Sequence, residues 1–72
     1  MSDVARWVID MLARAVGEEP ARRAVEEVLT QLGRSPEALD RRGALEVLET
    51  LAQRPGLVGT SALFAKSRIY LA

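Results

Sequence analysis

A chain of 72 residues is long enough for one domain only, and a domain of this size buries about 60% of its unfolded surface, so its core is small. The sequence contains no histidine and no cysteine, which removes the usual general base near neutral pH, the commonest metal ligands and any disulfide. We therefore expect no catalytic, cofactor-binding or metal-binding residue and no enzyme activity, and the zero net charge argues against a polyanionic partner.

The first predicted element is a helix over residues 3–16. Ser2 can cap its amino end, and Gly17 suits the left-handed residue that closes it. Apolar residues at helical spacing form its inward stripe, which consists of Val4, Val8, Met11, Leu12 and Ala15. Trp7 lies on the same helix, and we expect it either to pack at the edge of the core or to anchor a partner, because tryptophan is enriched in interface hot spots.

The second predicted helix covers residues 20–32, with Pro20 at its first position and Gly33 after its last. Its buried face is expected to consist of Ala21, Ala24, Val25, Val28, Leu29 and Leu32. The other face alternates glutamates and arginines four residues apart. That alternation is typical of a solvated, ion-paired helix surface rather than of a cation site.

Ser35-Pro36-Glu37 has the residue types that begin a helix, so we expect a helix to restart there. Gly43 leaves its length open. Either one bent helix runs on, or a short helix over residues 36–41 precedes a longer one over residues 44–53 that Asp40 caps. In both cases the buried stripe consists of Leu45, Leu48, Leu51 and Ala52.

The last segment, residues 56–72, follows a helix stop at Arg54-Pro55-Gly56 and contains no acidic side chain. We expect a helix here, with a short strand at residues 68–71 as the alternative. At 100° per residue its apolar groups form three strips: Leu57, Phe64 and Leu71; Val58, Ala62, Ala65 and Ile69; Leu63 and Tyr70. One small core cannot cover three strips, so this segment is the candidate interface. Phe64 is assigned to the core.

These elements predict an all-α fold, a small bundle of four to five short helices in a single domain over residues 1–72. The predicted function is protein–protein interaction, in an adaptor or regulatory role, with a protein partner or a homo-oligomer. Leu63, Ile69, Tyr70 and Leu71 are the expected apolar anchors, and Lys66 and Arg68 the rim charges.

A weaker alternative is a DNA-binding regulator. Residues 43–56 resemble the first helix and turn of some winged-helix repressors, and residues 66–71 are similar to their recognition helix. The resemblance implies DNA contacts at Lys66, Ser67 and Arg68. However, residues 57–65 are too few for the helix, turn and cap that should come between, and residues 50–72 hold only three bases, so nucleic acid is not the expected partner.

The amino-terminal residues carry no basic run, and Asp10 and Arg14 interrupt the first apolar stretch. We therefore expect no signal peptide, no membrane contact and a cytoplasmic location.

Overall fold

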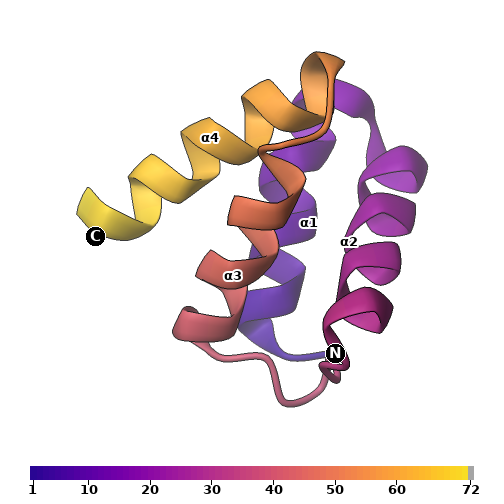
Figure 1. Ribbon diagram of the computed structural model, residues 1–72, viewed down its shortest axis with the longest axis vertical. Coiled ribbons are helices and arrows are strands. Elements are labelled where there is room, and N and C mark those ends of the chain that lie inside the picture. Colours follow the sequence, from indigo (N-terminus) through magenta and orange to yellow (C-terminus); the bar gives the residue numbers. More distant parts are fainter. Residues whose placement is uncertain (72) are drawn as a thin grey trace.

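The computed structural model describes the backbone of residues 1–71 and the side chains of residues 1–69. This part of the chain forms four helices and no strand, namely α1 (Asp3–Val16), α2 (Glu18–Leu32), α3 (Arg41–Leu51) and α4 (Gly56–Leu71). Helices α1 and α2 lie side by side, α3 packs against both, and α4 runs obliquely across α1 and α3 (Figure 1). The prediction of a small all-helical bundle is confirmed for these residues.

Helix α1 begins where Ser2 predicts, because the Ser2 hydroxyl accepts a hydrogen bond from the Ala5 amide at 3.1 Å. The same residue also fastens the chain end to the α2–α3 connection. Its backbone amide donates to the Pro36 carbonyl at 2.9 Å, and its hydroxyl donates to the Leu39 carbonyl at 3.0 Å. The buried stripe is rotated from the predicted one, since Ala15 is exposed and Ala5 and Ile9 are fully buried.

Helix α2 begins at Glu18, two residues before the expected start, and Pro20 lies within its first turn, where a missing amide hydrogen leaves no bond unmade. It ends as predicted at Gly33, whose φ of 68° lies in the left-handed region and whose amide reaches back to the Leu29 and Thr30 carbonyls. The predicted inward face is buried, apart from the partly buried Leu32.

The expected helix restart at Ser35 is wrong. Residues 36–38 form a turn, in which the Ser35 hydroxyl accepts from the Glu37 amide at 3.3 Å and donates to the Glu37 carboxylate at 3.0 Å. A single helix, α3, starts later, where the Asp40 carboxylate accepts from the Gly43 amide at 2.8 Å. The Asp40 cap is therefore correct, and Gly43 lies in the first turn of α3 rather than between two helices.

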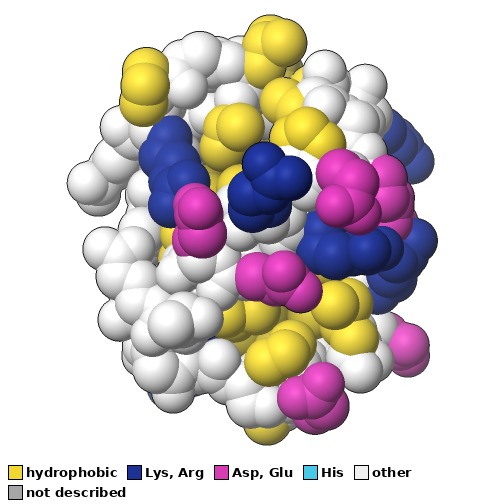
Figure 2. Space-filling model, turned by 90° about the vertical axis from the view of Figure 1, so that its right-hand side faces the viewer, with side chains coloured by type: hydrophobic (Ala, Val, Ile, Leu, Met, Phe, Trp, Pro, Cys, Tyr) yellow, Lys and Arg dark blue, Asp and Glu magenta, His cyan; other side chains and the backbone are white. Residues whose placement is uncertain are grey.

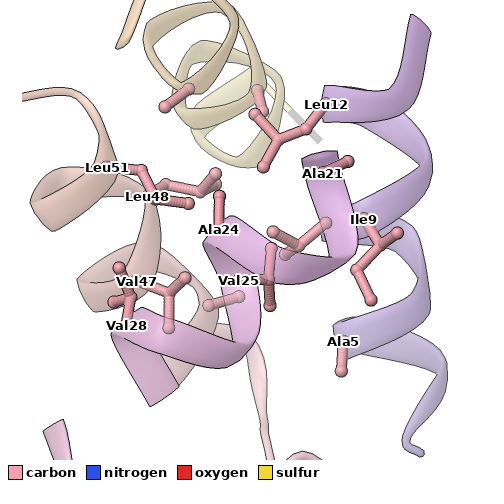
Figure 3. Close-up of a cluster of buried hydrophobic side chains, with 14 of the residues drawn as sticks. Ala5, Ile9, Leu12, Ala21, Ala24, Val25, Val28, Val47, Leu48 and Leu51 are labelled. Carbon is pink, nitrogen blue, oxygen red and sulfur yellow. The ribbon is translucent and has the colours of Figure 1, made fainter. Parts of the chain in front are cut away.

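The core is one continuous cluster to which all four helices contribute. In Figure 3, Ile9 and Leu12 of α1 point towards α2, and Val28 of α2 lies beside Val47 of α3. The largest fully buried side chains all come from the first three helices: Val8, Ile9, Leu12, Val25, Val28, Val47, Leu48 and Leu51. Helix α4 contributes the smaller set Ala62, Ala65 and Ile69.

The α2 side of the molecule carries acidic and basic side chains next to one another (Figure 2). Arg22 lies 3.1 Å from Glu18 and 3.3 Å from Glu19, and Arg54 lies 2.8 Å from Glu27. Exposed pairs of this kind contribute about 0.2–1 kcal/mol each. Glu18, Glu19 and Glu27 of α2 are thus charge-paired with arginines, which fits a solvated helix face.

A closer pair joins the α2–α3 connection to α3, with Arg34 Nε 2.7 Å from Glu46 Oε1. The hydrogen bond from Arg34 holds the pKa of the Glu46 carboxyl below its ordinary value. Because the pKa of Glu46 is lowered in the folded chain, its pair with Arg34 stabilises the folded state at neutral pH. That contribution is lost as the pH falls through the lowered pKa.

The turn into α4 depends on a close backbone approach at Gly59, which is buried. A Cβ atom at this position would overlap the carbonyl oxygen of Arg54, which belongs to the backbone of the turn itself. A Cβ atom at Gly43 would instead lie 2.7 Å from Cδ1 of Leu39, the end of a flexible side chain. Of these two glycines, only Gly59 has no room for a side chain.

We expect Gly59→Ala to lower the free energy of unfolding by about 1–3 kcal/mol relative to Gly43→Ala. Both substitutions replace a helical glycine by alanine and gain the same propensity of about 1 kcal/mol, so their difference isolates the steric conflict. Urea denaturation followed by circular dichroism measures it. Equal stability of the two variants would contradict this account of the turn.

Candidate functional site

Helix α4 has an inner face of Val58, Ser61, Ala62, Ala65 and Ile69. Ala62 and Ala65 are fully buried, Ile69 is 8% exposed, and Val58 packs against the core. These residues fall within one side of the helix at 100° per residue. Of the three apolar strips in the sequence, the core covers the one that contains the two alanines.

The outer face of α4 consists of Leu57, Thr60, Leu63, Phe64 and Ser67. Leu57 is 63% exposed, Leu63 54% and Phe64 70%, and among the described residues only Met1 is another exposed large hydrophobic side chain. Exposed apolar side chains scattered singly are normal, but three on one side of one helix form a patch. The outer face is therefore the main exposed apolar surface in the described part of the chain.

The polar residues of the outer face use their hydroxyl hydrogens within the helix. Thr60 Oγ1 donates to the Gly56 carbonyl at 3.3 Å, and Ser67 Oγ donates to the Leu63 carbonyl at 3.1 Å. No ionisable side chain belongs to this face. Covering it would consequently strand neither a charge nor a hydroxyl donor.

A shallow depression of about 220 Å³ lies in the outer face, lined by Thr60, Leu63, Phe64 and Ser67. These residues occupy positions i, i+3, i+4 and i+7 of the helix. Four residues at this spacing form the hole that receives a side chain of a facing helix in knobs-into-holes packing. The depression thus lies at a position where a side chain of a facing helix would insert.

The basic residues of α4 lie on roughly opposite sides of the helix. Lys66 Nζ lies 3.3 Å from Glu49 Oε2 of α3, so its charge is paired within the chain. Arg68 lies across the helix, beside a groove of about 580 Å³ formed by α1, α3 and α4. We call this the side groove, and its lining consists of Asp3, Val4, Trp7, Arg41, Ala44, Arg68 and Ile69.

The predicted interface residues thus do not share one surface. Leu63 belongs to the outer face, whereas Trp7 and Arg68 line the side groove. Ile69, expected as an exposed anchor, is instead a buried residue of the core that reaches the floor of that groove. The side chains of Tyr70 and Leu71 lie outside the described residues.

Phe64 is the clearest correction, because the sequence assigned it to the core and it is the most exposed large hydrophobic side chain among the described residues of α4. Thr60 and Ser67, which complete the depression, were not among the predicted interface residues. A signal for them existed, since hydroxyl residues seven positions apart flank the Leu63-Phe64 pair.

No family model, no curated protein and no solved structure matches this chain. Within the described residues, no helix is both long and apolar enough to cross a membrane.

Shortening a side chain should affect the free energy of unfolding differently on the two faces of α4. Ile69→Ala should lower the free energy of unfolding by about 2–5 kcal/mol, because it opens a cavity in the core. Phe64→Ala should change it by no more than about 0.5 kcal/mol, because the ring is mostly in water. Chemical denaturation at low protein concentration measures both. The reverse order would mean that α4 is rotated from the position described.

Proposed function

We propose that this chain is a small protein–protein interaction module, adaptor or regulatory in role, that self-associates through the outer face of α4. The observation that carries the proposal is the exposed depression lined by Thr60, Leu63, Phe64 and Ser67. A partner for this depression should offer a helix whose side chain inserts into it, no ionised group and large apolar side chains. A second copy of the same face meets all three requirements.

Two copies can meet around a two-fold axis that passes between positions 63 and 64, with the two α4 helices antiparallel. Leu63 of each copy then lies opposite Phe64 of the other, and Thr60 lies opposite Ser67. Each copy supplies both the knob and the hole, as a self-complementary two-fold interface requires. Like charges do not meet, because the outer face has none and Lys66 is paired with Glu49.

The expected affinity is modest. Fully burying a leucine or phenylalanine contributes about 1.5–3 kcal/mol, and association costs about 4–15 kcal/mol. Leu57, Leu63 and Phe64 are already partly covered, so the gain from burying these three side chains in each copy is of the same order as that cost. The contact is also confined to one helix of 16 residues, about 24 Å long. The area that it buries is therefore smaller than the roughly 800 Å² per partner of a standard interface. We therefore expect a weak dimer, with a Kd in the micromolar range or higher.

The alternative function, DNA binding, has less support from the described residues. Duplex affinity grows with the number of phosphates that Lys and Arg side chains neutralise. In α4, Lys66 is paired with Glu49, and Arg68 lies at the side groove on the other side of the helix. Two separated bases make no patch, so binding of duplex DNA that weakens steeply with salt is not expected.

Sedimentation equilibrium over a wide range of protein concentration tests the self-association. We expect a monomer–dimer equilibrium for the unmodified chain and a monomer for Leu63→Glu and Phe64→Glu, each of which would bring two carboxylates together at the centre of the contact. The matched control is Ala15→Glu, which adds the same charge at an exposed position of α1.

Circular dichroism verifies that each variant stays folded. A purely monomeric unmodified chain, or a Phe64→Glu variant that dimerises like the control, would overturn the proposal.

The antiparallel arrangement has its own test, because the chain has no cysteine of its own. Thr60→Cys and Ser67→Cys proteins, mixed and oxidised, should form the mixed disulfide faster than either forms a disulfide with itself. Positions 60 and 67 face each other across the axis, whereas 60 and its own copy are seven residues, about 10 Å, apart along the helix. Non-reducing electrophoresis separates the products once one variant carries a mass tag. Faster self-linking of either protein would contradict this register.

A further inference from the structure

We infer that the side groove is a binding site for a small aliphatic monocarboxylate, separate from the outer face of α4. The groove lies where α1, α3 and α4 meet, and its volume of about 580 Å³ is in the range of about 300–1,000 Å³ common for small-molecule sites. It holds an apolar floor and a charged rim, and these two parts define the ligand.

The floor suits a hydrocarbon chain. It is built from Val4, Ala44 and Ile69, one residue from each of the three helices. None of these side chains has a polar atom, and Ala44 and Ile69 belong to the core cluster. An aliphatic chain laid on this floor would exchange water for apolar contacts without meeting an unsatisfied donor or acceptor.

The rim suits one negative charge. Arg41 and Arg68 are its two cations and Asp3 its one anion, which leaves a net charge of +1. No ion pair between described residues involves any of these three side chains. A guanidinium presents parallel donors that match a carboxylate, so a monoanionic carboxylate completes the charge balance.

Arg41 is held in position before any ligand arrives. Its Nη2 atom donates to the backbone carbonyl of Ile69, one of the last carbonyls of α4, which have no partner within their own helix. The remaining N–H groups of that guanidinium stay available to a ligand. A cation fixed in this way loses less side-chain freedom when it binds.

Trp7 supplies the wall of the groove and a third donor. It is half-buried and packs against the core cluster. Its indole N–H takes part in none of the hydrogen bonds between described residues. The ring therefore offers an apolar surface to the chain of a ligand and a hydrogen bond to its polar end.

Trp7 is also the only tryptophan, so its fluorescence reports on the groove directly. Sodium octanoate, kept below its micelle concentration, should change that fluorescence in a saturable manner with a stoichiometry of one per chain. Octan-1-ol, which has the same chain without the charge, should bind roughly tenfold more weakly, and octylammonium should not compete. Calorimetry provides a second measurement that does not depend on the fluorophore.

Arg68→Ala should weaken octanoate binding by roughly tenfold. The affinity of Arg68→Lys should lie between those of the unmodified chain and Arg68→Ala, since lysine keeps the charge and loses the paired donors. Arg68 is exposed, so the fold should survive. The control is Arg42→Ala, which removes an equal exposed charge from α3 outside the groove.

The Leu63→Glu protein should bind octanoate like the unmodified chain, which separates this site from self-association, because Leu63 does not line the side groove. Equal affinity for octanoate and octanol, or equal effects of Arg68→Ala and Arg42→Ala, would overturn the assignment.

Discussion

The structure depends on how closely α4 can approach the other helices. The distance between packed helices is set by the side chains between them, and α4 presents two alanines, a serine and a glycine that is also buried. The first three helices already supply all of the largest fully buried side chains. A leucine or phenylalanine on the inner face would hold α4 away from a core with no space for it. Leu57, Leu63 and Phe64 are therefore left outside, which creates the outer face.

Besides its apolar packing on α1 and α3, α4 makes three further contacts, and all involve α3 or the turn that follows it. Gly59 lies against the Arg54 carbonyl at the start of the helix, Lys66 pairs with Glu49 further along, and Arg41 binds the Ile69 carbonyl near its end. The last contact matters most for the side groove, because the same guanidinium fastens α4 and forms part of the rim. The position of Arg41 in the groove thus follows from its hydrogen bond to a carbonyl at the end of α4.

Short-range signals made the helix boundaries predictable where one signal acted alone. The Ser2 and Asp40 caps, the Gly33 end and the Arg54-Pro55-Gly56 break depend on neighbours within a few residues, and all four appear in the structure. The start at Ser35 failed because its hydroxyl binds Glu37 in a turn instead. The faces of α4 were not predictable in this way. A helix with three apolar strips does not itself say which strip is buried, and the space left by α1, α2 and α3 exchanged the expected roles of Phe64 and Ile69.

The two surfaces of α4 differ in chemistry yet share one requirement. The outer face is uncharged and apolar, so it suits a copy of itself, whereas the side groove has a net positive rim that suits a small anion. Both exist only while α4 is docked on α1 and α3. A ligand in the side groove touches all three helices, so its binding free energy adds to the stability of the docked state by mass action. An occupied groove would therefore favour the arrangement that displays the outer face, although no residue of the groove belongs to that face.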